Sequence, residues 1–164
     1  MREDELMDQL PGIGRWNAVA AQDRSLFAYG TLQFPEVLEV LIGRVPQRTT
    51  ATAPGWRVAA LPGRVYPGLV PEPNALAHGV LLAGLTAAEW AILDAFEDDE
   101  YDLRPIHLAD SADPAWTYVW TAPVAQEDWH RGHFATHHLP HFITRSAEWR
   151  DGSKMWSDRQ NGDH

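Results

Sequence analysis

Bulky apolar residues recur along this chain in short runs interrupted by glycine and proline, a pattern typical of buried strands joined by tight turns. The first committed run, 25–29, ends at Gly30, where the missing side chain lets the backbone turn or approach a ligand closely. Apolar residues then recur with helical spacing from Pro35 to Arg44, and proline suits the first position of a helix. We therefore predict a strand, a tight glycine turn and a helix, whose main-chain N–H groups form an anion site.

Further strands are expected along the rest of the chain. Prolines exclude the segment 64–71 from the centre of a sheet, and Pro105 puts its own strand at an edge or a bulge. Because strands outnumber helices and come in adjacent runs, we predict an α+β fold with a small mixed β-barrel flanked by helices. The predicted strands, besides a short strand or loop over 64–71, are 53–58, 78–85, 101–108 and 115–120.

Three more helices are indicated. Thr86 and Glu89 have the spacing of a capping box, which begins a helix running to about Phe96. After Pro123 the apolar positions predict one helix, and Pro140 separates it from a second over 142–149. Residues 1–24 are expected to form a loosely ordered extension, 25–150 one domain, and 151–164 a polar tail.

Composition narrows the possible functions. A chain of 164 residues with 45% hydrophobic residues can bury the core of one domain without a metal or a disulfide. It has no cysteine, which excludes thiolate chemistry and is compatible with the cytosol, so a cytoplasmic location is expected. Its net charge of −10 argues against nucleic acid as a partner. Neither a signal peptide nor a membrane-spanning segment is evident, and the oligomeric state is left open.

Four carboxylates lie close together at the end of the helix over 86–96. Helical phase puts Glu97 on the same face as Trp90 and Leu93, whereas Asp98 faces elsewhere. Burial and the negative end of a helix both raise the pKa of a carboxylate, and a raised pKa suits a general base. From phase alone, a partly buried Glu97 paired with an arginine such as Arg104 is the more common outcome.

An ordered set of short motifs adds to this interpretation. Each motif is weak alone, but together they resemble the gamma-glutamylcyclotransferase-like superfamily, in particular its plant avirulence-induced-gene-type branch and the gamma-glutamylamine cyclotransferases. The similarity covers roughly residues 26–149, and one departure is Asp98, where the family often has glycine. The motifs are Phe27–Leu32, Val65–Gly68, Gly79–Leu81, Leu93–Glu97, and Glu100-Tyr101 with Arg104.

The resemblance implies a small β-barrel with flanking helices and an enzyme that acts on a small gamma-glutamyl compound. It implies that the loop Tyr29, Gly30, Thr31 and Leu32 binds the gamma-glutamyl group through main-chain N–H groups, and that Glu97 is the acid/base. The α-amino group of the substrate would then attack its own γ-carbonyl, releasing 5-oxoproline and an amine or amino acid. Neither a cofactor nor a metal is implied.

Two alternatives stay open. The chain could be a non-catalytic barrel of the same fold that binds a small anionic ligand or a protein. Histidines 130, 133, 137 and 141, with His138 adjacent, fall at roughly helical spacing, which a metal site would use. Pro140 breaks that register, so surface or packing histidines are the favoured interpretation. The eight tryptophans are spread through strands and helices and are expected to pack in the core.

Overall fold

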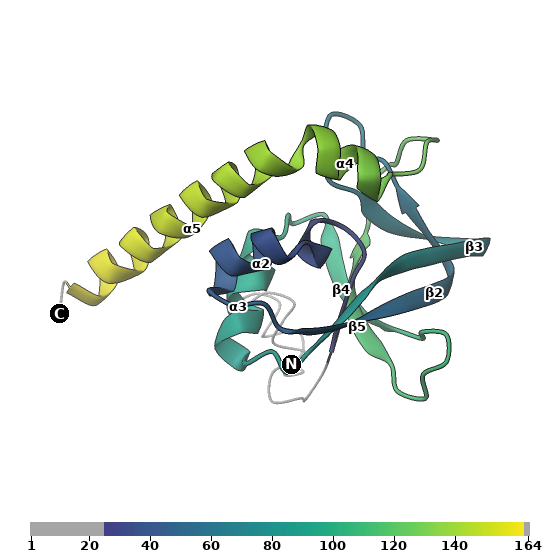
Figure 1. Cartoon of the computed structure of the whole chain (residues 1–164), viewed down its shortest axis with the longest axis horizontal. Helices are drawn as coiled ribbons and strands as arrows, with labels where there is room; N and C mark the ends of the chain where they lie inside the picture. The colour runs from purple at the N-terminus through teal and green to yellow at the C-terminus, as the bar shows by residue number, and fades with distance from the viewer. Residues whose placement is uncertain (1–24, 163–164) are drawn as a thin grey trace, which may run out of the picture.

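The structure, a computed structural model of the chain, describes residues 25–162, with side chains as far as residue 153; the expected N-terminal extension, 1–24, lies outside the described residues. Its described part contains five strands and several helices (Figure 1). The elements are β1 Leu26–Ala28, the 3-10 helix η2 Thr31–Gln33, α2 Pro35–Ile42, β2 Gln47–Ala59, β3 Gly68–Ala83, α3 Ala87–Phe96, β4 Tyr101–Ile106, β5 Ala115–Trp120, α4 Arg131–His137 and α5 Leu139–Gly162.

The five strands form one sheet in the order β2-β3-β1-β5-β4. Strand β1 lies at its centre, antiparallel to β3 and parallel to β5. A further pairing of Leu69 in β3 with Val119 in β5 draws these two strands together past the short β1. The sheet is therefore curled, but it does not close, so the predicted α+β class is confirmed while the predicted barrel is an open, curled sheet.

Both faces of the central strand β1 are buried. Because side chains alternate along a strand, Leu26 and Ala28 of β1 pack into one apolar cluster while Phe27 and Tyr29 pack into another. The first cluster also holds buried residues of α2 and α3, including Leu93, and Figure 1 shows these two helices beside the sheet. Such two-sided burial explains why the strand at 25–29 has an apolar run without polar alternation.

The prediction for the first helical region is confirmed with one addition. Helix α2 has Pro35 in its first turn, as its sequence predicts. It ends at Gly43, which has a left-handed φ of 76°, a conformation that glycine adopts without strain. Between β1 and α2 the chain makes one extra turn, the 3-10 helix Thr31–Gln33. The glycine turn is therefore a short helix in its own right.

Strands β2 and β3 are longer than predicted. Pro54-Gly55, a pair typical of turns, is an irregularity inside β2, where the register with β3 shifts and Gly55 has a φ of 84°. The ranges 64–71 and 78–85 were expected to be separate, yet the single strand β3 includes 68–71 of the first and 78–83 of the second.

The exclusion of prolines from a central strand was wrong here, and the ladder explains why. β3 pairs with β1 only at 80–82 and with β5 only at Leu69. Pro71 and Pro73 lie between these pairings, where β2 is the only strand partner among the described residues and the ladder skips from Pro71 to Leu76. Proline has no N–H to donate, but at these positions no second strand of the described chain lies beside β3 to accept one.

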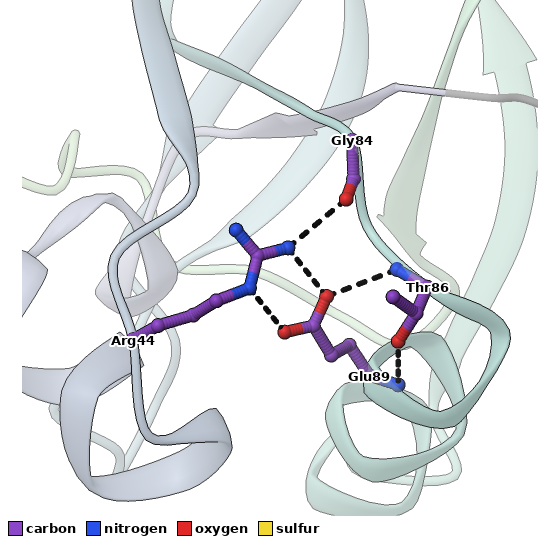
Figure 2. Close-up of polar contacts among 4 residues, drawn as sticks. All are labelled: Arg44, Gly84, Thr86 and Glu89. Carbon is purple, nitrogen blue, oxygen red and sulfur yellow. Dashed lines mark hydrogen bonds and ion pairs between the residues drawn. The ribbon is translucent and has the colours of Figure 1, made fainter.

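Helix α3 confirms both its predicted range and its capping box. The Thr86 hydroxyl accepts from the Glu89 N–H at 3.1 Å, and the Glu89 carboxylate accepts from the Thr86 N–H at 2.9 Å. The same carboxylate accepts two hydrogen bonds from Arg44, which follows α2, and Arg44 also donates to the Gly84 carbonyl (Figure 2). One glutamate thus caps α3 and joins it to the end of α2.

The last two helices differ from the prediction at their ends. Helix α4 begins at Arg131 because the preceding segment hydrogen-bonds to β2 instead: Ala125 N–H donates to Ala60 O, and Trp129 N–H to Val58 O. Pro140 lies in the first turn of α5, which its lack of an N–H permits. α5 continues to Gly162, past the predicted end at Trp149, and Figure 1 shows it running past α2 and away from the sheet. Within the described part of the chain, no helix has the length and apolarity needed to cross a bilayer.

Candidate functional site

A pocket of about 680 Å³ opens between the central strand, the end of α3 and one side of α5. All five predicted site residues line it, so the structure brings together segments that are about 65 residues apart in the sequence. Residues 63–67 and the neighbours of Glu97 within 95–99 also line it. The predicted residues in the lining are Tyr29, Gly30, Thr31, Leu32 and Glu97.

The loop after β1 is held rigidly from both sides. The Tyr29 hydroxyl donates to the Tyr118 carbonyl at 2.5 Å, and the Gln33 amide donates to the Tyr29 carbonyl at 2.8 Å. At Gly30, an added Cβ would lie 2.9 Å from Cγ of the buried Pro67. Glycine is therefore required here by the close approach of two chain segments.

The amides of this loop are available at the pocket. Gln33 N–H donates to the Gly30 carbonyl and Phe34 N–H to the Thr31 carbonyl, so the turn becomes hydrogen-bonded from Gln33 onward. The first N–H groups of any helix lack partners within that helix. Among the described residues, no main-chain acceptor is found for the N–H groups of Thr31 and Leu32. Two such amides at a pocket wall can donate to a carboxylate or an oxyanion.

Glu97 reaches the pocket by a different route from the one that helical phase predicted. α3 ends at Phe96, and Glu97 is the capping residue, with extended backbone angles of φ −79° and ψ 142°. Its side chain is half-buried and lines the pocket. Because the residues after Phe96 leave the helix, their directions follow the turn rather than the helical stripe.

The expectation that Glu97 alone would point inward was wrong. Asp94 is buried in α3 and accepts a hydrogen bond from the Tyr118 hydroxyl at 3.0 Å. Asp98 and Asp99 line the pocket beside Glu97. Arg104 was considered above as a possible ion-pair partner of Glu97. It is not part of the pocket wall, and its Nε donates to Asp102 at 2.6 Å.

Asp98 has partners of its own. The Tyr66 hydroxyl donates to it, and Arg64 Nε lies 4.0 Å from the same oxygen. Arg64 also contacts Glu100 at 3.2 Å. Asp98 is thus engaged in a network with the Tyr66 phenol and the Arg64 guanidinium.

All four tyrosines of the chain line this pocket. Burial raises the pKa of the Tyr29 hydroxyl well above its ordinary value, and the Glu97 carboxylate raises it further. Burial likewise raises the pKa of Tyr101, with smaller contributions from Tyr29 and Glu97. Burial and the hydrogen bond to Asp98 raise the pKa of Tyr66. These three phenols therefore stay neutral at physiological pH, and the carboxylate of Glu97 is close enough to act on two of them.

Sequence reasoning missed the wall that α5 contributes. Residues 141, 142, 145, 146 and 149 of α5 line the pocket, together with His138 at the end of α4. Their spacing of three and four residues places them on one helix face, which is a signal the sequence carries. The signal went unused because the pattern did not show which element that face meets. Phe142 and Trp149 pack edge-on against Phe96, with ring centroids 6.0 and 5.1 Å apart, and so hold α5 against the end of α3.

The histidines divide between two places. The rings of His133 and His137 stack one turn apart on α4, with centroids 4.4 Å apart, whereas His138 and His141 line the pocket. Over residues 25–153, no group of three histidine or carboxylate side chains has a geometry that could hold a metal ion.

Comparison with known proteins places the chain among plant-type relatives. The family model described as "Gamma-glutamyl cyclotransferase, AIG2-like" matches residues 26–135. "AIG2-like protein C" of Arabidopsis thaliana is 34% identical over 137 residues, covering 79% of this chain and 80% of that protein. "AIG2-like protein D" of the same plant is 33% identical over 135 residues, covering 77% and 89%.

Solved structures agree in fold. The solution structure of an Arabidopsis thaliana protein has a TM-score of 0.58 and 31% identity, and the match covers 82% of this chain and 95% of that one. A structure titled "Gamma-glutamyl cyclotransferase" has a TM-score of 0.52 at 14% identity, covering 75% and 85%, which is a likeness of fold alone. With a family model matching most of the described domain and relatives above 30% identity along most of their length, the chain belongs to the AIG2-like gamma-glutamyl cyclotransferase family.

Proposed function

We propose that this protein is a cyclotransferase that releases 5-oxoproline and an amine or amino acid from a gamma-glutamyl compound. The observation that carries the proposal is that the Glu97 carboxylate and the amides of the loop 29–32 line the same pocket. Family membership supports the reaction class. The reaction needs no nucleophile from the protein, because the attacking nitrogen belongs to the substrate.

In the proposed mechanism the loop amides bind an anionic group of the substrate, and Glu97 accepts a proton from its α-ammonium. The freed nitrogen attacks the γ-carbonyl carbon, and a five-membered ring forms as the new C–N bond closes. The carbonyl oxygen carries the developing negative charge until the bond to the departing nitrogen breaks. Over the whole reaction the α-nitrogen loses two protons and the departing nitrogen gains two, so the Glu97 carboxylate is regenerated.

The surroundings of Glu97 favour it over the other pocket groups as the base. The phenols of Tyr29, Tyr66 and Tyr101 have raised pKa values, so none is a phenolate near neutrality. The Asp98 carboxylate already has two protein partners, since it accepts a hydrogen bond from the Tyr66 hydroxyl and lies 4.0 Å from Arg64 Nε. The remaining rate acceleration comes from folding the substrate against a rigid wall, because holding two reacting groups in contact greatly accelerates a ring closure.

The test compares 5-oxoproline formation from gamma-glutamyl-alanine by the wild type and by Glu97→Gln. Glutamine keeps the shape and can still accept a hydrogen bond from an ammonium, but it cannot accept the proton. Removing a general base typically lowers the rate by a factor on the order of 10²–10⁴. Asp99→Asn is the matched control, since Asp99 is an exposed carboxylate in the same pocket wall.

The outcomes separate the possible readings. Loss of turnover in Glu97→Gln with a similar KM, and near-normal turnover in Asp99→Asn, supports the proposal. If Glu97→Gln stays active while Asp98→Asn or Glu100→Gln is inactive, another carboxylate is the base. If the wild type binds gamma-glutamyl compounds and forms no 5-oxoproline from any of them, the chain is a binding protein of this family.

A further inference from the structure

Helix α5 brings a cation to the rim of the pocket that the proposed reaction does not use. Arg145 is exposed and lines the pocket. Phe142, three residues earlier, and Trp149, four residues later, share its helix face and both pack on Phe96. Because Phe96 directly precedes Glu97, this packing fixes Arg145 on the side of the pocket next to the candidate base.

Arg145 differs from the other arginine of the lining. Arg64 contacts Glu100 at 3.2 Å and Asp98 at 4.0 Å, and its guanidinium also lies 4.9 Å from the centre of the Trp120 ring. Within residues 25–153, no ion pair or hydrogen bond is found for Arg145. A guanidinium that faces a pocket without a protein partner can bind an incoming carboxylate through two parallel N–H groups.

The pocket has room for more than the gamma-glutamyl group. Its volume of about 680 Å³ is in the range that holds drug-sized ligands, roughly 300–1,000 Å³. The departing part of the substrate must therefore occupy some of it. Glu97, Asp98 and Asp99 line the wall formed by the end of α3, and the chain carries a net charge of −10. A carboxylate on the departing part would be repelled by that wall, whereas Arg145 of α5 offers it a positive charge.

We infer that Arg145 binds a carboxylate on the departing group, so that the preferred substrates are gamma-glutamyl amino acids or peptides rather than uncharged gamma-glutamyl amines. This inference rests on the proposed function and assigns Arg145 a role in specificity. The remaining polar groups of the α5 wall are His138, His141 and Ser146. The Ser146 hydroxyl is engaged with the Phe142 carbonyl of its own helix at 2.7 Å. The two histidines are the competing candidates that the experiment must separate from Arg145.

The experiment uses a matched pair of compounds, gamma-glutamyl-alanine and gamma-glutamyl-alaninamide, which differ only in the charge of the departing group. We expect the kcat/KM of the wild type to be about tenfold or more higher for the acid than for the amide. The difference should come mainly from a lower KM for the acid. Arg145→Gln should bring this acid-to-amide ratio close to one. Arg145→Lys, which keeps the charge without the planar fork, should retain part of it. A charge-assisted hydrogen bond commonly changes affinity by roughly 10- to 100-fold, and the exposed position of Arg145 favours the lower end.

Two controls keep the result specific. Arg104→Gln removes an exposed arginine of β4 that lies outside the pocket wall, and it should leave the acid-to-amide ratio unchanged. Affinity for both compounds is also measured by titration calorimetry on each variant, at a pH and temperature where turnover is negligible or absent. This readout does not depend on catalysis, so it reports on Arg145 even if no 5-oxoproline forms.

The failure of this inference is distinguishable from failure of the proposed function. Absence of 5-oxoproline in every assay overturns the function, while tighter binding of the acid that Arg145→Gln abolishes still supports the role of Arg145. Equal affinity and turnover for acid and amide in the wild type overturns the inference. It is also overturned if Arg145→Gln keeps the wild-type ratio, or if His138→Gln or His141→Gln alone removes it. Binding of neither compound overturns it as well.

Discussion

Replacing Gly30 by alanine tests how closely the loop after β1 packs on the segment 63–67. The added Cβ would lie 2.9 Å from Cγ and 3.0 Å from Cδ of Pro67, closer than ordinary van der Waals contact. Pro67 cannot give way easily, since it is buried, its ring is rigid, and its carbonyl accepts from the Tyr101 hydroxyl at 2.5 Å. Forcing one extra carbon into such a site typically costs about 1–3 kcal/mol.

The expected loss can be measured by thermal unfolding. For a domain of this size each kcal/mol shifts Tm by about 2–4 °C, so Gly30→Ala should lower Tm by roughly 2–12 °C. Gly132→Ala is the matched control. Gly132 lies in α4, a Cβ there would meet nothing within 4 Å, and alanine favours the helix. Its Tm should stay the same or rise slightly.

The same variant tests whether the loop binds the substrate. If the amides of Thr31 and Leu32 bind an anionic group, moving the loop off Pro67 should weaken the affinity for gamma-glutamyl-alanine more than Gly132→Ala does. A Gly30→Ala protein that melts with the wild type would refute the packing argument. One that is destabilised yet binds as tightly as the wild type would refute the role of the loop amides in binding.

Three further predictions concern metal dependence, capping and acid sensitivity. EDTA should leave turnover unchanged, because no three ligand side chains converge within the described residues; a loss that zinc restores would revive the histidine site. Thr86→Ala should lower the free energy of unfolding by about 1 kcal/mol, whereas Thr86→Ser should keep most of the wild-type stability. Equal stability of the wild type and both variants would contradict the capping role. The hydrogen bond from Arg44 lowers the pKa of Glu89, so the ionised form stabilises the fold. Urea unfolding should thus separate the wild type from Glu89→Gln fully above the ordinary glutamate pKa of about 4.3, and the gap should shrink as the pH falls through the lowered pKa; a gap that does not change with pH would contradict this.

Several features of the fold could be predicted from local sequence because local interactions determine them. The capping box at Thr86 and the proline that opens α2 act within one helical turn, and both are confirmed. Pro105 predicted an edge strand, and β4 is an edge of the sheet, paired only with β5. The ordered motifs predicted the family, which the comparisons confirm.

Strand length and helix ends required the tertiary structure. Nothing local shows that Pro71 lies where β3 has one neighbour, so a proline there reads as a break. Trp129 has helical spacing with the residues that follow it, but its N–H donates to Val58 of β2 and the segment stays extended. Long-range hydrogen bonds overrode the local preference in both places.

The sequence by itself determined that the residues of the loop 29–32 and Glu97 belong to one family pattern, and the structure brought them to one pocket. Helical phase failed for the carboxylates because the helix ends at Phe96, after which the direction of each side chain depends on the turn. Only the tertiary structure revealed the wall formed by α5. A helical stripe shows that a face is buried, but what it meets is decided by the packing of Phe142 and Trp149 on Phe96. That packing brings Arg145 to the pocket. The sequence could not show this, because a contact between segments about 50 residues apart has no signature in either segment alone.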